Sequence, residues 1–334
     1  MKWLLGAAVC VGTFFVLTVI LALWLVTSPM PSIAELKDVF DFSSLRKAPA
    51  DIPPPSLQRY RARDGEELAY RLYESTAERI LIFVHGSSYH GGGYHALAAA
   101  LSLSGAAKVV LPNLRGHYQS GRHRGDVEYI GQLEDDMADL IGELRSQHRN
   151  GPITLGGHSS GGGFAIRFAG GPYGREVSSY LLLAPVIPTS KAPRQGTAGG
   201  WANLNFRRLY GLVALNAVGI HGFNGLPVID FNKPAKLWDG TETLSYSYRL
   251  NVSYHPRFRY QGDVEALTGS TLVLIGANDE AIDPDALHTI FTTSAPKAQF
   301  SVQPQLSHFG IFSDPATWDT IGAWLKALPP GGRS

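Results

Sequence analysis

The segment with the clearest chemical pattern covers residues 153–163 and reads Ile-Thr-Leu-Gly-Gly-His-Ser-Ser-Gly-Gly-Gly. It contains a G-x-S-x-G pattern centred on Ser159, directly after an apolar run typical of a buried strand. Small residues two before and two after the serine let a strand and a following helix approach closely, and the sharp turn between them exposes the hydroxyl. We therefore predict that Ser159 is a nucleophile. If Ser160 were the nucleophile, His158 would occupy a position that requires a small residue.

A histidine near the C-terminus has the position of a general base for this serine. A final strand is predicted within residues 298–310, and His308 follows it in a loop before the last helix. Such a loop lets an imidazole reach from the edge of a sheet to the serine. Three other histidines fit this role less well, because they lie in an inserted segment or on a helix: His221, His255 and His288.

A carboxylate that could orient the base follows another predicted strand. The apolar run 271–275 leads into Gly-Ala-Asn-Asp-Glu, and an acidic side chain in such a loop can fix the tautomer of the imidazole. We choose Asp279 for this role, and Glu280 and Asp283 remain alternatives. Asp283 also precedes Pro284, which is the pattern of a helix N-cap followed by a first-turn proline.

Other residues argue against metal chemistry. His85, His90 and His95 are five residues apart, and this spacing matches no zinc-binding pattern. The chain has a single cysteine, Cys10, so neither an internal disulfide nor a cysteine metal cluster is possible. We predict neither a metal site nor a cofactor.

The composition is that of a globular protein. The chain has 334 residues and a formal net charge of +1. No basic stripe with interleaved aromatic residues is present, which argues against a nucleic-acid partner. The length allows one large domain with an inserted cap. The oligomeric state is left open.

The N-terminal segment is long and apolar. Residues 3–26 contain no charged side chain, and as a helix they would measure about 36 Å, more than the ~30 Å hydrocarbon core of a bilayer. A cleaved signal peptide is the alternative, but its apolar stretch is usually shorter and ends in small residues. We therefore predict an uncleaved single-pass transmembrane anchor, which makes the membrane a partner. The short N-terminus would place the catalytic domain outside the cytoplasm, although flanking charges are nearly balanced.

The rest of the chain alternates between strand and helix patterns, which predicts an α/β fold with a mostly parallel sheet covered by helices on both faces. The proline-rich residues 27–57 are typical of a tether. Residues 189–266 break the alternation and are rich in aromatic residues and glycine, so we predict a cap or lid there. The predicted core is formed by residues 58–188 and 267–328.

The chain resembles the α/β-hydrolase superfamily, and within it the serine aminopeptidase, monoacylglycerol lipase and lysophospholipase-like group. The resemblance covers roughly residues 60–328, and the order serine, aspartate, histidine is the one expected of this superfamily. One loop departs from the group's pattern Asp-x-Arg-Gly-x-Gly-x-Ser, because it reads Asn113-Leu114-Arg115-Gly116-His117-Tyr118-Gln119-Ser120. The stretches that carry the resemblance are His85-Gly86-Ser87-Ser88, Asn113-Leu114-Arg115-Gly116-His117, Gly157–Gly162, Gly276-Ala277-Asn278-Asp279 and Ser307-His308-Phe309.

The resemblance implies an α/β-hydrolase fold and acyl transfer through an acyl-enzyme on Ser159. The backbone N–H groups of Ser87 and Ser160 would form the oxyanion hole. The expected substrate is a lipid-like or small acyl ester, which the triad does not distinguish from a peptide. A serine aminopeptidase-like peptidase or amidase is the first alternative, and a catalytically silent binding module is the second. Aromatic residues of the cap are candidates for lining an acyl channel, although ordinary core packing explains each one singly: Trp201, Phe206, Tyr210, Phe223, Phe231 and Trp238.

Overall fold

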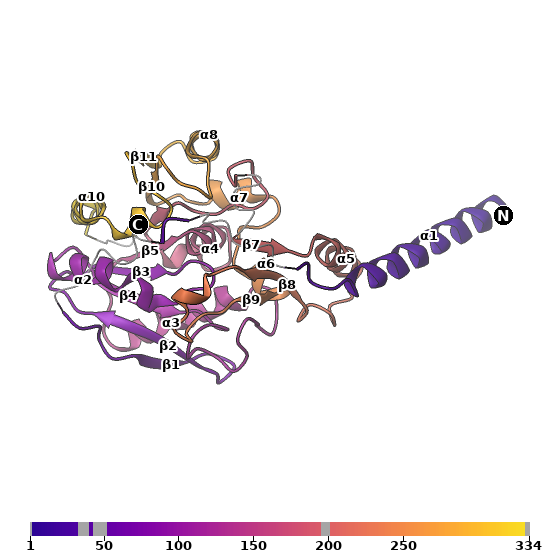
Figure 1. The fold of residues 1–334 in the computed structure, drawn as a ribbon, viewed down its shortest axis with the longest axis horizontal. Coiled ribbons are helices and arrows are strands. Elements are labelled where there is room, and N and C mark those ends of the chain that lie inside the picture. Colours follow the sequence, from indigo (N-terminus) through magenta and orange to yellow (C-terminus); the bar gives the residue numbers. More distant parts are fainter. Residues whose placement is uncertain (1, 33–39, 43–51, 195–200, 331–334) are drawn as a thin grey trace.

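A central sheet of eight strands organises the molecule (Figure 1). The computed structural model describes residues 2–32, 40–42, 52–194 and 201–330, and in the N-terminal helix it describes the side chains of Trp3 and of residues 12–26. The strand order is β1-β2-β4-β3-β5-β6-β10-β11. Strand β2 pairs antiparallel with β1 and β4, and the other pairs are parallel. The strands are β1 Gln58–Arg61, β2 Glu67–Tyr73, β3 Ile80–Val84, β4 Lys108–Asn113, β5 Ile153–His158, β6 Ser179–Leu183, β10 Ser270–Gly276 and β11 Gln299–Gln303.

The inner strands are buried because helices cover both of their faces. Every residue of β3 and of β6 is buried, as expected of strands inside a parallel sheet. Helix α2 packs against α10, and α4 packs against α7, so the sheet is covered by separate groups of helices. The helices of this layer structure are α2 His95–Leu103, α3 Gln132–Ser146, α4 Ser160–Ala169, α7 Tyr260–Glu265, α8 Pro284–Ser294, α9 Gly310–Ser313 and α10 Pro315–Ala327, with 3-10 turns η2 Gly91–Tyr94 and η3 Gly174–Glu176.

An insertion separates β6 from β10, although these two strands are neighbours in the sheet. We call residues 189–266 the cap; residues 195–200 of it lie outside the described part of the chain. Its three short strands form a separate antiparallel sheet in the order β7-β8-β9. The cap elements are β7 Ala202–Leu204, α5 Phe206–Ala217, β8 Pro227–Phe231, η4 Ala235–Leu237, β9 Ser245–Ser247 and α6 Tyr248–Ser253. Helix α7 also falls within these residues, but it packs against α4 of the core.

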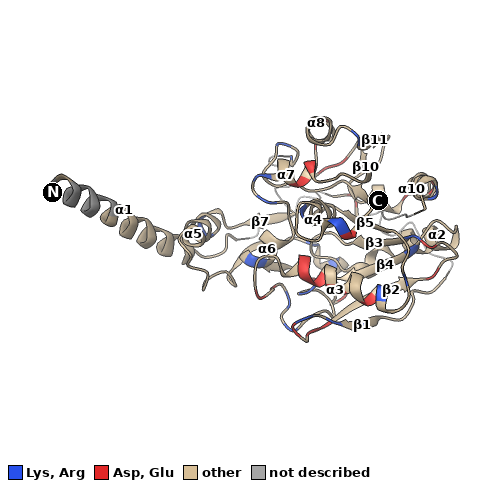
Figure 2. Cartoon of the chain, turned by 180° about the vertical axis from the view of Figure 1, so that it is seen from behind, with Lys and Arg blue, Asp and Glu red and all other residues tan. Residues whose placement is uncertain are grey.

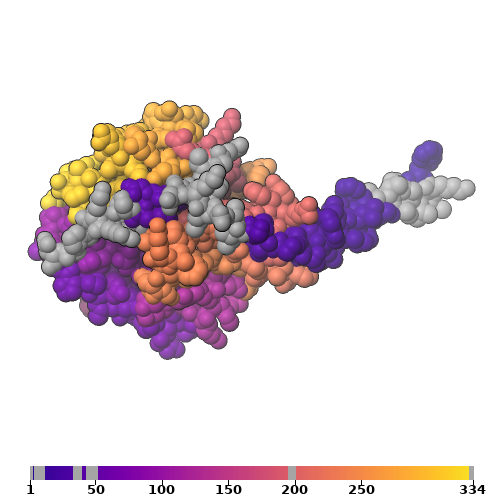
Figure 3. Space-filling model, viewed as in Figure 1, coloured from indigo at the N-terminus to yellow at the C-terminus, as the bar shows by residue number. Residues whose placement is uncertain are grey.

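The N-terminal helix α1, Lys2–Val26, extends from the body of the molecule beside the cap helix α5 (Figures 1 and 3). Its C-terminal end is part of the folded structure, because Ala22 and Val26 are buried against α5. Gly211 of α5 allows this close approach, since a Cβ atom there would lie 2.8 Å from the carbonyl oxygen of Ala22. Arg208 donates from Nε to the carbonyl of Val26 at 3.1 Å, which closes the end of α1.

The predicted transmembrane anchor is wrong, and with it the predicted single-pass membrane location outside the cytoplasm. No helix within the described residues combines the length and the apolar character needed to cross a bilayer. The residues of α1 whose side chains are described carry no charge (Figure 2), which agrees with the uncharged run that suggested the anchor. Some of those apolar residues instead pack on the cap. Much of the predicted tether, residues 33–39 and 43–51, lies outside the described residues.

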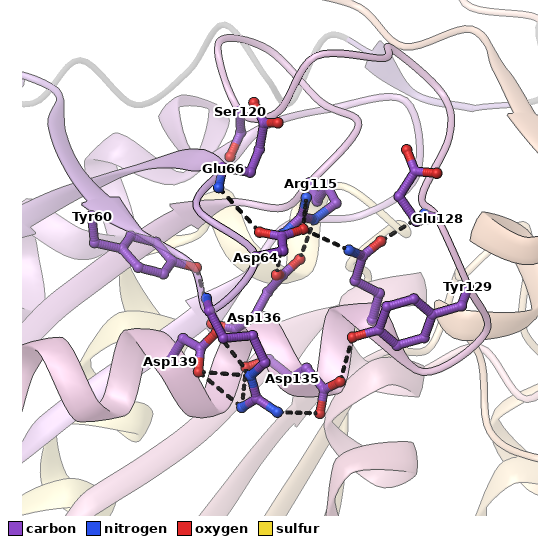
Figure 4. Close-up of polar contacts among 12 residues, drawn as sticks. Tyr60, Asp64, Glu66, Arg115, Ser120, Glu128, Tyr129, Asp135, Asp136 and Asp139 are labelled. Atoms are coloured by element: carbon purple, nitrogen blue, oxygen red, sulfur yellow. Dashed lines mark hydrogen bonds and ion pairs between the residues drawn. The ribbon is translucent and has the colours of Figure 1, made fainter.

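A buried arginine holds the loop that follows β4 (Figure 4). Arg115 donates from Nε and Nη2 to both carboxylate oxygens of Asp136 on α3, at 2.8 and 2.7 Å. It also forms an ion pair of 2.9 Å with Asp64 in the turn between β1 and β2. Ser120 of the same loop accepts a hydrogen bond from the backbone of Ala69 at 3.1 Å. The departures from the family pattern in this loop therefore leave its arginine anchor in place.

Replacing Arg115 by methionine is expected to lower the free energy of unfolding by about 3–5 kcal/mol, because the carboxylate of Asp136 would be left buried without its partner. The side chains of this pair are 7% and 5% exposed. Arg122→Met is the matched control, since the Arg122 side chain is 78% exposed in its ion pair with Glu66 and should change nothing measurable. Urea unfolding of both variants measures the difference. Equal stability of the two variants would contradict a structural role for Arg115.

Candidate active site

Ser159 lies at a strained turn between β5 and α4. Its φ and ψ are +56° and −121°, a conformation that non-glycine residues rarely adopt. The flanking glycines are needed for space, because a Cβ atom on Gly157 would collide with Gly161, and one on Gly161 would collide with the carbonyl of Val84. The sequence pattern therefore has the steric cause proposed for it, and the turn presents the Ser159 side chain to a pocket.

The structure brings Ser159, His308 and Asp279 together. The Nε2 atom of His308 lies 3.0 Å from the Oγ atom of Ser159, and its Nδ1 atom lies 2.8 Å from Oδ2 of Asp279. Because a carboxylate accepts only, Nδ1 carries the proton and Nε2 is free to accept the serine proton. Both His308 and Asp279 are buried, and Ser159 is partly exposed.

The three candidate carboxylates have different partners. Asp279 faces the imidazole, and its second oxygen accepts from the backbone N–H groups of Ala281 and Ile282 at 2.9 and 2.7 Å. Glu280 accepts from the backbone N–H of His308 at 2.8 Å and does not face the ring. Asp283 caps α8 by accepting from two backbone N–H groups of its first turn. The geometry therefore favours Asp279 over both alternatives as the partner of the imidazole.

The two predicted oxyanion donors lie just beyond the carboxyl ends of two neighbouring parallel strands, β3 and β5. Ser87 follows β3, Ser160 is the first residue of α4, and both line the pocket that Ser159 faces. Neither backbone N–H donates to an acceptor among the described residues, as expected for Ser160 in the first turn of a helix. A Cβ atom on Gly86 would lie 3.3 Å from the Cβ of Ser159, so the loop after β3 runs directly beside Ser159.

A buried hydrogen-bonded chain that the sequence did not indicate supports this loop. The backbone N–H of Gly86 donates to the hydroxyl of Tyr94 at 2.9 Å, and that hydroxyl lies 2.9 Å from Nδ1 of His158. The Nε2 atom of His158 donates to the carbonyl of His308 at 2.9 Å. Burial, and then the nearby His308, hold the pKa of His158 well below its usual range, so it is neutral and can accept from Tyr94. His158 therefore connects the backbone of His308 to the loop after β3.

The pocket beside Ser159 has a volume of about 320 Å³ and a mostly apolar lining. Of the six aromatic residues of the cap that were considered for an acyl channel, three line it, and the other three are exposed away from it. The lining aromatics are Trp201, Phe206 and Phe231; the exposed ones off the pocket are Tyr210, Phe223 and Trp238. A pocket of this size and character suits an apolar ligand with few polar groups.

The segment of residues 40–42 also contributes to the pocket, although the sequence suggested only a tether there. Phe40 is 6% exposed, and its ring centroid lies 5.4 Å from those of both His308 and Trp201. The backbone N–H of Asp41 donates to Glu280 at 3.0 Å. Residues before the core therefore cover part of the surroundings of His308.

The three histidines considered for a metal site have separate partners. His85 contacts its own loop and Tyr254, and His90 accepts from the N–H of Gly92. His95 faces the hydroxyl of Tyr73 at 2.8 Å. Their rings serve to connect local segments and do not converge on one point.

Comparison with solved structures shows the fold. A soluble variant of monoglyceride lipase from Saccharomyces cerevisiae matches with a TM-score of 0.65 and 16% identity, over 84% of this chain and 98% of that one. A monoacylglycerol lipase from Paleococcus ferrophilus matches with a TM-score of 0.59 and 21% identity, over 77% of this chain and 98% of that one. The chain is thus an α/β hydrolase by fold, and its predicted resemblance to that superfamily is confirmed.

Sequence comparisons match part of the chain to one family model and to several lipases. The family model for serine aminopeptidase S33 matches residues 75–218, which is less than half of the chain. A monoacylglycerol lipase from Mycolicibacterium smegmatis is 30% identical over 37% of this chain and 44% of its own length. Human monoglyceride lipase is 31% identical over 43% of this chain and 48% of its own length. The chain therefore spans less than half the length of these curated relatives, and the matches support the prediction of a serine ester hydrolase.

Proposed function

We propose that this chain hydrolyses a carboxylic ester with an apolar acyl group through an acyl-enzyme on Ser159. The observation that carries the proposal is the hydrogen-bonded series Ser159–His308–Asp279 at an apolar pocket. The class of the relatives agrees with it, since those named above are lipases of monoacyl esters.

The reaction has two halves. His308 takes the proton of Ser159 as its Oγ atom attacks the ester carbonyl, and the resulting oxyanion is held by the N–H groups of Ser87 and Ser160. His308 then gives that proton to the leaving alcohol as the ester C–O bond breaks. Water attacks the acyl-enzyme with His308 again as base, which releases the acid and restores Ser159. Asp279 holds the imidazole in the required tautomer and stabilises its cation in both halves.

The pocket favours an ester over a peptide substrate. A peptidase that grips a free amino terminus needs a carboxylate near the reacting carbonyl, and no aspartate or glutamate is among the described residues that line the pocket. Glu242 of the cap is already paired with Lys233 at 2.7 Å. The apolar lining instead suits an acyl chain.

An acyl-chain series tests this proposal. Burial of each methylene is worth about 0.8 kcal/mol, so kcat/KM for monoacylglycerols should rise up to about fourfold per methylene until the pocket is filled. Trp201→Ala should reduce this gain and leave acetate ester hydrolysis unchanged, because Trp201 lines the pocket. Trp238→Ala is the control, since that side chain is 53% exposed and lies off the pocket. Faster cleavage of aminoacyl amides than of every ester would overturn the proposal.

A further inference from the structure

A chain of three polar side chains runs from the cap to the two loops that would form the oxyanion hole. His255, which follows α6 in the cap, places Nε2 at 3.2 Å from the Oγ atom of Ser160. The Oγ atom of Ser160 is in turn hydrogen-bonded to the Oγ atom of Ser87. All three residues line the catalytic pocket, and they come from three separate segments of the chain.

The direction of these hydrogen bonds is fixed at the cap end. Nδ1 of His255 lies 2.8 Å from the carbonyl oxygen of Asn251, which can only accept, so Nδ1 carries the proton. Burial lowers the pKa of His255 to about 4, so the ring is neutral at pH 7 and Nε2 is an acceptor. Ser160 therefore donates its hydroxyl proton to His255, and the Oγ atom of Ser160 accepts from the hydroxyl of Ser87.

A second contact from the cap holds the same loop. The backbone N–H of Ser88 donates to the hydroxyl of Tyr246 in β9 at 2.8 Å, and Ser88 has a strained φ of +69°. A residue in such a conformation persists only when its surroundings fix it. The cap therefore constrains the backbone directly after Ser87.

We infer that His255 is a positioning residue of the oxyanion hole, which acts through the hydroxyls of Ser160 and Ser87 to fix the two peptide N–H groups. The inference rests on the proposed function. Donors to an oxyanion are effective only when they are oriented before charge develops. Since His255 belongs to the cap and contacts the side chain of Ser160, the position of the cap and the stabilisation of the transition state are coupled.

Three variants test this role. In His255→Leu the acceptor is lost, and kcat is expected to fall about 10- to 100-fold with KM within twofold, somewhat less than the loss caused by deleting a donor. His255→Gln, which can again accept from Ser160, should recover most of kcat. Ser160→Ala keeps its N–H but cuts the chain, so it should match His255→Leu, and combining the two should add nothing. His288→Leu, an exposed histidine on α8, is the control that leaves kcat unchanged.

Ligand binding separates this role from a merely structural one. A trifluoromethyl ketone with an alkyl chain forms an oxyanion on the serine, whereas a glycerol alkyl ether of the same length does not. His255→Leu should weaken ketone binding by the same factor as kcat and leave ether binding unchanged. Equal ketone affinity in wild type and His255→Leu, or an equal loss for ketone and ether, would overturn the inference. Absence of ketone binding to the wild type would instead overturn the proposed function. If His255→Leu does not fold, Ser160→Ala decides the same comparison.

Discussion

Replacing Ser159 by alanine is expected to lower kcat for ester hydrolysis by about 10⁴- to 10⁶-fold, with the fold retained. Alanine keeps the Cβ atom at the turn between β5 and α4 and removes only the Oγ atom that lies 3.0 Å from His308. Without this atom no acyl-enzyme forms, and the remaining rate comes from substrate binding and the oxyanion hole. Steady-state kinetics with a monoacylglycerol of medium chain length measure the loss.

Ser160→Ala is the matched control, because it removes a hydroxyl from the adjacent residue. Its backbone N–H stays in place, and only the hydrogen bond to His255 is lost. We therefore expect kcat to fall by no more than about 100-fold. Labelling by a fluorophosphonate should be retained in Ser160→Ala and abolished in Ser159→Ala. A Ser159→Ala variant with activity near that of Ser160→Ala would contradict the assignment of the nucleophile.

Lowering the pH from 7 to 5 is expected to reduce the free energy of unfolding by up to about 8 kcal/mol. Burial holds the pKa of His85 and of His158 well below the usual range. It also lowers the pKa to about 4 at three further rings, those of His90, His117 and His255. The unfolded chain binds a proton at each of these rings near pH 6.5, whereas the folded chain does not until pH 4 or below. The stabilisation that these neutral rings contribute is therefore fully present above pH 6.5. It falls as the pH decreases, by up to about 1.4 kcal/mol per pH unit for each ring.

One carboxyl group opposes this trend. Burial raises the pKa of Asp136 to about 6 despite the adjacent Arg115, so the folded chain takes up this proton before the unfolded chain does. Protonation of Asp136 restores about 1 kcal/mol of the free energy of unfolding between pH 7 and 5, and the net loss given above includes this amount. Urea unfolding at several pH values measures the slope. His117→Gln should reduce the slope by about one proton, and His123→Gln, an exposed control, should not. A stability that is flat between pH 7 and 5 would contradict the buried neutral rings.

The local features of the site could be predicted from the sequence because neighbouring residues determine them. The glycines around Ser159 and the N-cap at Asp283 act within a few residues, and the structure shows the contacts expected of them. The order of strands and helices follows from hydrophobic runs, which also predicted the α/β fold. The sequence alone does not separate Asp279 from Glu280, because the two carboxylates are adjacent. The conformation of the loop determines which of them faces the His308 ring.

The features that the sequence did not indicate depend on contacts between distant segments. His255 lies 95 residues from Ser160, and nothing in its surroundings in the sequence marks it as a partner of the oxyanion loops. Phe40 is likewise far in sequence from the pocket that it lines. For α1, an apolar run predicts a helix well but does not reveal what that helix contacts, and its packing against α5 through Gly211 is a tertiary feature.

The most direct test of the account is the position of a fluorophosphonate adduct on the wild-type chain, located by fragmenting the peptide that contains residues 153–163. We predict one phosphonyl group, bonded to Oγ of Ser159, and loss of the adduct when a monoacylglycerol competes. An adduct on Ser160 or Ser87 with Ser159 unmodified would contradict the proposed mechanism.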